Sequence, residues 1–324
     1  MTDKTPPPSE FVELAKSLSD LSQVLVAGKR RENNWLTFKR AGITAIFIAL
    51  VLFYIVFYAR QLGYQSDPIV DAVAIVPIRG PIGQGMDASA ENIVPILHRA
   101  CASPRVHTVV LEISSGGGTP SESERIIDAI KACKQGDAEN DIAPKPVIAL
   151  IDGVGASAAY MISLHADSIY AGRYSLVGSI GAIVRWQDIS SLANEHGVFE
   201  RAFRSAPLKG GASMWVSPSS DESADVQQMV SSLAQVFFDE VKEKRGSKIT
   251  LDDATLFSGR VWSAQVSLDH GIIDGIATLE SLQATQFKGM KIHRYRTDPT
   301  IIESMGLAQA VRQAVAEFRE PVIQ

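Results

Sequence analysis

The apolar run Pro146–Ile151 is followed at once by Asp152-Gly-Val-Gly-Ala-Ser157-Ala-Ala-Tyr160. This pattern predicts a buried strand that breaks at small residues and continues as a helix, with Ser157 close to the turn. A serine held there by tight packing can project its hydroxyl into a cleft, beside a backbone N–H that can stabilise an oxyanion. The stretch therefore indicates an α/β fold and marks Ser157 as a candidate nucleophile.

Strand-like and helix-like patterns alternate from Val73 onward. Strands are predicted at Val73–Ile78, Thr108–Ile113, Pro146–Ile151 and Ser168–Ala171. Helices are predicted at Ala90–Ala102, Ser121–Cys133, Ser157–His165, Asp221–Arg245, Leu251–Leu256 and Ser263–Leu268. In the second helix, Ser121 and Glu124 have the spacing of a capping box. Alternation of this kind predicts a layered fold in which helices pack against a sheet.

The segment Ala41–Ala59 has no charged residue and is long enough to span a membrane, which takes about 20 residues. Because it begins some way into the chain and lacks a small-residue cleavage pattern, we expect an anchor rather than a cleaved signal peptide. Basic residues cluster before it, at Lys29–Arg31 and Lys39–Arg40. The positive-inside rule then predicts a cytoplasmic N-terminus and an exported domain after Arg60.

The predicted organisation has five parts, which are residues 1–40, 41–59, 60–72, 73–285 and 286–324. The first part contains apolar residues at spacings of three and four, namely Phe11, Leu14, Leu18, Leu21 and Leu25. They predict an amphipathic helix that ends near Lys29–Arg31. This helix could lie on the membrane, pair with copies of itself, or simply be solvated. Residues 60–72 form a polar linker, and residues 286–324 a C-terminal extension.

The net charge of −5 gives no indication of a nucleic-acid partner. Cys101 and Cys133 could pair in an oxidising compartment, but each lies in a helix-like stretch, and we expect two buried thiols. The chain has no Walker motif, no HExxH and no Cys/His spacing typical of a metal site. We therefore expect neither a metal nor another cofactor.

A serine nucleophile needs a base within hydrogen-bond reach. His165 lies eight residues along the same predicted helix as Ser157, a rise of about 12 Å that prevents direct contact. Lys209 lies in a stretch without any other charge between Arg204 and Asp221. Apolar surroundings favour the uncharged form of a lysine, which is the form that accepts a proton. Taken alone, a lysine in such a glycine-rich loop is most often an exposed loop residue; paired with Ser157, Lys209 is predicted to be the general base.

The oxyanion would need N–H donors close to Ser157. The turn Ser115-Gly-Gly-Gly118 follows a predicted strand, so Gly117 or Gly118 could donate together with the N–H of Ala158. Ser179 could supply a second hydroxyl that holds the lysine.

The segment Gly153-Val-Gly-Ala-Ser-Ala158 also fits a dinucleotide-binding fingerprint. Against that alternative, Asp152 would place a carboxylate at the pyrophosphate. The next strand, Ser168–Ala171, also does not end in the acidic residue that binds a ribose.

Taken together, these residues resemble the signal peptide peptidase A family, serine peptidases of class S49 related to the Clp protease and crotonase folds. The likeness rests on five segments in the same order as in the family: Ser115–Gly118, Ala156–Tyr160, Gly178–Gly181, the loop of Lys209, and Gly259–Asp274. It covers residues 73–285 and implies a Ser157/Lys209 dyad with an oxyanion site at Gly117, Gly118 and Ala158.

The resemblance also implies a homo-oligomer anchored in the bacterial inner membrane, with its peptidase domain in the periplasm. The substrates would be peptides such as remnant signal peptides. Two departures from the family pattern affect the site: Ala158 and Ala159 replace a glycine pair, and Gly116 replaces a proline. They leave open a weak or inactive relative that binds peptides as a membrane-tethered scaffold.

Overall fold

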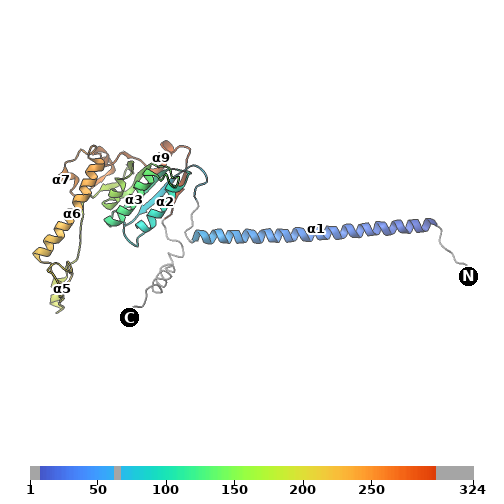
Figure 1. Ribbon diagram of the computed structural model, residues 1–324, viewed down its shortest axis with the longest axis horizontal. Coiled ribbons are helices and arrows are strands. Elements are labelled where there is room, and N and C mark those ends of the chain that lie inside the picture. Colours follow the sequence, from blue (N-terminus) through green and yellow to red (C-terminus); the bar gives the residue numbers. More distant parts are fainter. Residues whose placement is uncertain (1–7, 62–66, 297–324) are drawn as a thin grey trace. The chain divides into compact units, whose positions relative to one another are not determined.

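The computed structural model describes residues 8–61 and 67–296 (Figure 1). The chain divides into two units, one made of residues 1–64 and 300–324 and the other of residues 65–299. The described part of the first unit is one helix, α1 (Pro8–Gln61). Within α1, Trp35–Tyr58 is long and apolar enough to cross a membrane, with a mean hydropathy of 2.5. The predicted span Ala41–Ala59 ends one residue beyond this stretch.

The prediction that the N-terminal helix ends near Lys29–Arg31 is wrong, because α1 continues through these residues without a break. Residues 9–61 contain no proline, and their only glycines are Gly28 and Gly42. Each such glycine costs a helix about 1 kcal/mol relative to alanine, which a long helix tolerates. Charge clusters do not end helices, so Lys29–Arg31 is no stop signal.

The second unit alternates strands and helices, which confirms the predicted α/β class. Its elements are β1 (Ala72–Arg79), α2 (Ala90–Ala102), β2 (Val106–Ser115), α3 (Pro120–Gln135), β3 (Val147–Ala156), α4 (Ala158–Ser163), β4 (Ser168–Ala171), β5 (Leu176–Gly178), α5 (Ser190–Glu195), α6 (Ser220–Arg245), α7 (Asp253–Leu256), β6 (Val261–Ser263), α8 (Ala264–Asp269), β7 (Gly275–Ile276), α9 (Leu279–Thr285) and β8 (Lys291–Arg294). The predicted elements agree with these to within a few residues, while the short elements β5–β8, α5 and α9 have no predicted counterpart.

The strands of residues 67–296 form one eight-stranded sheet with the order β6-β5-β3-β2-β1-β8, and β4 and β7 lie off this path, where β4 pairs with β3 and β7 with β4. The pairs from β8 to β3 are parallel, and only β5–β6 is antiparallel. β3 changes its partner along its length: residues 148–151 pair with β4, and residues 154–156 pair with β5. The sheet therefore splits just before Ser157. In parallel sheets, clefts form beyond the carboxyl ends of the strands at such points.

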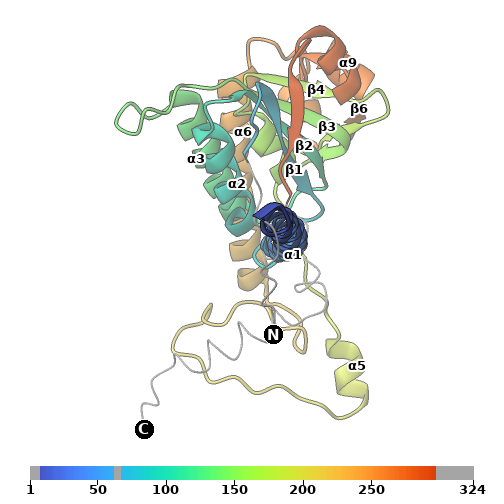
Figure 2. The same cartoon turned by 90° about the vertical axis from the view of Figure 1, so that its right-hand side faces the viewer.

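Both faces of the sheet are covered. α2 and α3 pack on one face, while α9 lies on the other (Figure 2). Alternate residues of β1 enter the two cores: Ala74, Val76 and Ile78 face α2 and α3, and Val73 and Ile75 face α9. A sheet buried on both sides explains why its strands read as continuous apolar runs.

Two predicted boundaries differ from the structure. α3 begins at Pro120 with Thr119 as its N-cap, so the predicted capping box from Ser121 to Glu124 does not form. Proline fits the first turn because its fixed φ is helical and its missing N–H needs no acceptor. The α/β domain also continues beyond residue 285, since β8 pairs with β1 and Tyr295 is buried.

Cys101 and Cys133 form a disulfide, so the expectation of two buried thiols is wrong. The bond joins α2 to α3, with the two Cα atoms 5.4 Å apart. These helices lie side by side on the same face of the sheet (Figure 2). Their proximity is a property of the sheet order, which the local sequence around each cysteine does not contain.

Removing this disulfide is expected to lower the stability of the domain. Its two cysteines are separated by 32 residues, and closing a loop of this size contributes about 4 kcal/mol. For a domain of this length that corresponds to a fall in Tm of about 8–16 °C. Thermal unfolding with and without dithiothreitol measures the effect, and a Cys101→Ser/Cys133→Ser variant is the control, because dithiothreitol should not change its Tm. Equal Tm values for the oxidised and reduced wild type would contradict the bond.

Candidate active site

Ser157 lies at the turn between β3 and α4, as the sequence predicts. It is the N-cap of α4 and is half-buried, with φ 52° and ψ −124°. Positive φ is rare for a residue with a side chain. Such a conformation costs about 1–3 kcal/mol and persists only where the surroundings impose it. Part of this constraint is the hydrogen bond from the Ser157 N–H to the Gly178 carbonyl at 2.7 Å. Strained strand-to-helix turns of this kind expose a nucleophile.

Gly117 packs directly against Ser157. A Cβ on Gly117 would lie 2.7 Å from the Ser157 Cβ and 2.8 Å from the Ala156 carbonyl oxygen, and the φ of Gly117 is +102°. Only glycine fits there. The register of β2 on β3, in which Ser115 is opposite Gly155, brings the glycine loop to this place. The structure thus unites two segments that the sequence analysis assigned to one site.

The predicted oxyanion donors differ in their hydrogen bonds. The Gly117 N–H donates to the Ser115 hydroxyl at 3.1 Å and is therefore engaged. The N–H groups of Gly118 and Ala158 have no acceptor within the described part of the chain. Ala158 is the first residue of α4, where N–H groups lack helical partners. Gly118 is held from both sides, since the Gly117 carbonyl and the Thr119 N–H bond to Ile82 at 3.0 and 2.8 Å.

Ser115 contributes to the site through its hydroxyl, a role that was not predicted from the sequence. A serine two residues before a glycine can accept that residue's N–H in a tight turn, so a sequence signal existed. Ser179 lies on the other side of Ser157, at φ 51°, and its N–H donates to the Arg260 carbonyl at 2.8 Å. Gly178 and Ser179 therefore flank the candidate nucleophile with a fixed backbone.

Lys209 is not brought to Ser157. It lies in a turn within residues 182–219, a segment that we call the arm, and its side chain is exposed. No hydrogen bond or ion pair joins this side chain to another residue of 8–61 or 67–296. The predicted apolar enclosure of Lys209 is therefore wrong for the single chain. Uncharged neighbours in the sequence do not bury a residue unless another surface covers them.

The arm is tied to the N-terminal end of α6 and extends away from the sheet, with α5 beyond that end of the helix (Figures 1 and 2). Arg204 bonds Glu222 at 2.6 Å, and Ser219 and Glu222 form a capping box. Hydrogen bonds from the Ser219 backbone and from Arg204 lower the pKa of Glu222 to about 2. Large apolar side chains of the arm are exposed, including Phe199 and the fully exposed Phe203.

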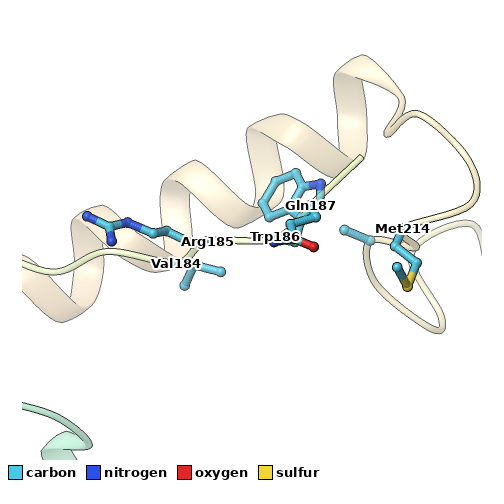
Figure 3. A pocket seen from close by; sticks show the side chains of 6 residues that line it. Val184, Arg185, Trp186, Gln187 and Met214 are labelled. Carbon is cyan, nitrogen blue, oxygen red and sulfur yellow. The ribbon is translucent and has the colours of Figure 1, made fainter. Parts of the chain in front are cut away.

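A cavity of about 900 Å³ lies on the arm and is lined by Val184, Arg185, Trp186, Gln187, Ala212 and Met214. Figure 3 shows the first four in an extended segment with Met214 beyond them. None of the residues around Ser157 lines this cavity. The cavity is therefore a feature of the arm and not of the nucleophile.

The structure also bears on the cofactor alternatives. Gly153 and Gly155 lie within β3 and not in a strand-to-helix turn, so they do not form the phosphate loop of a dinucleotide fold. Among residues 8–61 and 67–296, no group of three or more His, Cys, Asp or Glu side chains could hold a metal ion.

The chain is similar to known proteins in sequence and in structure. Residues 139–293 match the family model described as Peptidase family S49. A Brucella melitensis protein named Na⁺/H⁺ antiporter NhaA is 30% identical over 231 residues, which are 68% of this chain and 30% of that protein. An Enterococcus faecium protein that bears the name signal peptide peptidase SppA is 28% identical over 213 residues, or 66% of this chain and 58% of that protein.

Among solved structures, a membrane-bound stomatin-specific protease, 1510-N, in complex with a substrate peptide has 13% identity and a TM-score of 0.48 over 76% of this chain and all of that one. The chain spans 30% and 58% of the two curated relatives. The family match, residues 139–293, contains β3, Ser157, the arm and most of β8. Over that segment the chain matches peptidase family S49, as its resemblance to the signal peptide peptidases implied.

Proposed function

We propose that this protein is a serine peptidase with Ser157 as its nucleophile. The observation that carries the proposal is the geometry of Ser157, which is half-buried at a strained turn. Beside it, the N–H groups of Gly118 and Ala158 have no hydrogen-bond acceptor among the residues that the structure describes. The match of residues 139–293 to peptidase family S49 supports the same activity.

The proposed reaction is acyl transfer to a serine hydroxyl. The Ser157 Oγ attacks the carbonyl carbon of a peptide bond while Lys209 takes the hydroxyl proton. The N–H groups of Gly118 and Ala158 stabilise the oxyanion, and the proton passes to the leaving amine. Lys209 then activates the water that releases the acyl group. Ser179 would hold the amine of Lys209 in place.

This mechanism requires the arm to bring Lys209 to Ser157. The exposed apolar side chains of the arm indicate that it packs against a surface that a single chain lacks. We therefore propose a homo-oligomer in which neighbouring copies cover the arms. Such packing would exclude water around the lysine amine, and burial favours the uncharged form of a lysine.

The substrates would be membrane-derived peptides such as remnant signal peptides. The stretch Trp35–Tyr58 supports an anchor in the bacterial inner membrane. Basic residues before it support a cytoplasmic N-terminus and a periplasmic peptidase domain. The disulfide between Cys101 and Cys133 is consistent with that placement, because such bonds persist in oxidising compartments.

One observation favours a second function, a membrane-tethered scaffold that binds peptides without cutting them. Lys209 and Ser157 are apart in the single chain, and without a base a serine hydroxyl is a poor nucleophile. The uncovered arm would then serve only to bind peptides.

A covalent probe tests the proposed nucleophile directly. Full-length protein in detergent is treated with a serine-directed fluorophosphonate and assayed with a quenched apolar peptide. We expect the probe on the tryptic peptide that contains Ser157, peptide cleavage that the probe abolishes, and no loss of cleavage with EDTA. Protein that neither reacts with the probe nor cuts the peptide, at neutral or alkaline pH, would support the scaffold instead.

A further inference from the structure

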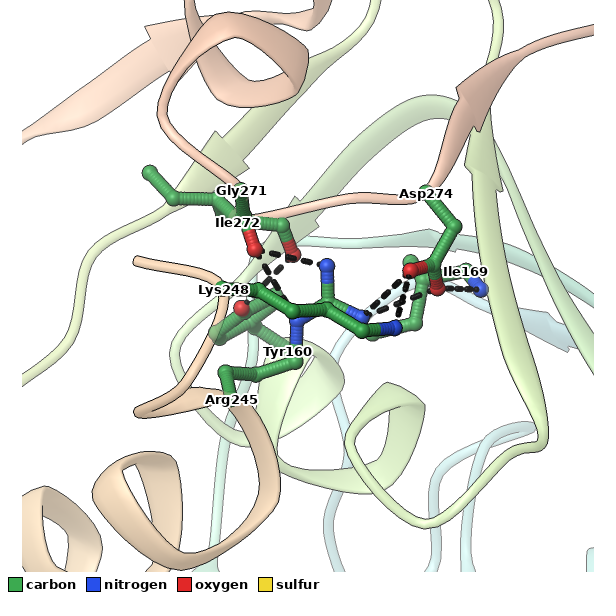
Figure 4. A network of polar contacts seen from close by, with 7 residues as sticks. All are labelled: Tyr160, Ile169, Arg245, Lys248, Gly271, Ile272 and Asp274. Atoms are coloured by element: carbon green, nitrogen blue, oxygen red, sulfur yellow. Dashed lines mark hydrogen bonds and ion pairs between the residues drawn. The ribbon is translucent and has the colours of Figure 1, made fainter. Parts of the chain in front are cut away.

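Arg245, the last residue of α6, is buried beneath the segment that precedes β7. Its Nε and Nη2 donate to the Gly271 carbonyl at 3.0 and 2.6 Å, and its Nη1 lies 2.9 Å from both carboxylate oxygens of Asp274 (Figure 4). The Arg245 side chain is only 5% exposed. A buried guanidinium held in this way fixes the end of α6 against residues 271–274.

Asp274 also receives hydrogen bonds from outside α6. The Ile169 N–H of β4 donates to it at 2.8 Å, and Lys248 Nζ lies at 2.7 Å. Burial raises the pKa of the Asp274 carboxyl, but the hydrogen bonds from Arg245 and Lys248 outweigh it and hold this pKa below its usual range. The carboxylate thus ties the sheet, α6 and residues 271–274 together, and we call this set of contacts the Arg245 clamp.

The helix that follows Ser157 is attached to the same clamp. Tyr160, three residues after Ser157 on α4, is fully buried, and its hydroxyl donates to the Ile272 carbonyl at 2.9 Å. Burial raises the pKa of the Tyr160 hydroxyl, which keeps it protonated and able to donate. Ile272 lies between the two clamp residues Gly271 and Asp274, so α4 and α6 are held by one short segment (Figure 4).

α4 needs such an anchor. It has only six residues, and a helix this short is not stable by its own hydrogen bonds. The Met161 N–H donates to the Ser157 carbonyl at 3.0 Å, so the first turn of α4 is part of what keeps Ser157 at positive φ. Strained conformations persist only where the surroundings over-determine them. A shift of α4 would therefore move the Ser157 hydroxyl and the Ala158 N–H together.

We propose that Tyr160 and Arg245 are positioning residues for the reaction, because the Arg245 clamp holds α4 and thereby the backbone of Ser157. The inference rests on the proposed role of Ser157. The clamp also links α4 to α6, the helix whose other end carries the arm. It gives a role to the segment Gly271-Ile-Ile-Asp274, which the resemblance marked and the reaction does not use.

Tyr160→Phe is the sharpest variant, since it removes one hydroxyl and keeps the ring. It leaves the buried Ile272 carbonyl without its hydrogen-bond donor and so weakens the anchoring of α4. We expect this loss of free energy to lower kcat about tenfold. We expect KM to stay the same. We also expect the fluorophosphonate to label every site, but about tenfold more slowly. A purely structural role would instead reduce the number of labelled sites and leave the rate at each of them unchanged.

Tyr170→Phe is the matched control. Tyr170 lies on β4, and its hydroxyl accepts a hydrogen bond from the Gln286 side chain at 2.8 Å on the α9 side of the sheet. The same atom is removed, but no contact to α4 or to residues 271–274 is lost. We expect wild-type kcat and labelling rate. A slowing equal to that of Tyr160→Phe would show that loss of any such hydroxyl has this effect, and would overturn the proposal.

Hydrogen exchange tests the clamp independently of activity. In Tyr160→Phe the Met161 amide should exchange about tenfold faster than in the wild type, whereas in Tyr170→Phe it should not change. Unchanged exchange in Tyr160→Phe would overturn the proposed anchoring of α4. If Ser157→Ala were as active as the wild type, the proposed function would be wrong, and the exchange result would still decide whether the clamp holds α4.

Discussion

Ser157→Ala is expected to lower kcat for peptide hydrolysis by about a thousandfold or more while leaving KM close to the wild-type value. The variant lacks the atom that attacks the carbonyl, and only the oxyanion donors and peptide binding remain. The N–H groups of Gly118 and Ala158, which have no acceptor within residues 8–61 and 67–296, do not depend on the hydroxyl, so substrate should still bind. Steady-state kinetics with a quenched apolar peptide measures both constants.

The matched control is Ser179→Ala. Ser179 also has positive φ, at 51°, and lies next to Gly178, whose carbonyl accepts the Ser157 N–H. The atomic change is the same, but Ser179 is proposed only to hold the base. We expect a loss of kcat of at most about tenfold. Wild-type activity in Ser157→Ala would show that Ser157 is not the nucleophile. The same would follow if Ser179→Ala abolished activity and Ser157→Ala did not.

The Ser157 turn could be predicted because its signal is local. An apolar run followed by small residues specifies a strand that ends in a tight turn, and β3 and α4 follow that pattern. The contact of the glycine loop with Ser157 could be predicted because parallel strands align their carboxyl ends, as β2 and β3 do. Both inferences need only the sequence of neighbouring elements.

Other features depend on contacts between distant residues. The disulfide, the pairing of β8 with β1, and the bond from Arg245 to Asp274 each join segments that carry no local sign of their partner. β8 is the four-residue run Lys-Ile-His-Arg with a single apolar residue, too weak a pattern to separate from a loop. Arg245 reads as one more charge at the end of an amphipathic helix, although it is buried.

The arm shows a different limit of sequence analysis. A stretch rich in apolar residues and poor in charge indicates that some surface covers it, but not which surface. For Lys209 the sequence leaves open whether that surface belongs to the same chain or to a neighbouring copy, and the structure leaves the arm uncovered. The exposed Phe199 and Phe203, like the uncharged sequence around Lys209, indicate that another surface covers the arm. That surface would come from the assembly of several copies.

Lys209→Ala is expected to lower kcat about a thousandfold, because a serine hydroxyl without a base is a poor nucleophile. Lys209→Arg should be equally impaired, since a guanidinium keeps its proton at any working pH. Lys131→Ala is the control: Lys131 is an exposed lysine of α3 that pairs with Asp128, and its loss should leave kcat unchanged. Wild-type kcat in Lys209→Ala would mean that another group is the base.

Mixing the two inactive variants then decides where the dyad is completed. If the arm of one copy supplies Lys209 to Ser157 of a neighbour, Ser157→Ala and Lys209→Ala chains mixed in equal amounts and reassembled should regain about a quarter of wild-type activity, because a random ring places an intact serine beside an intact lysine at that frequency. If each arm folds back onto its own domain, no mixture can contain an intact site and activity stays at the background. The exposure of Lys209 and of the apolar side chains around it leads us to expect recovery.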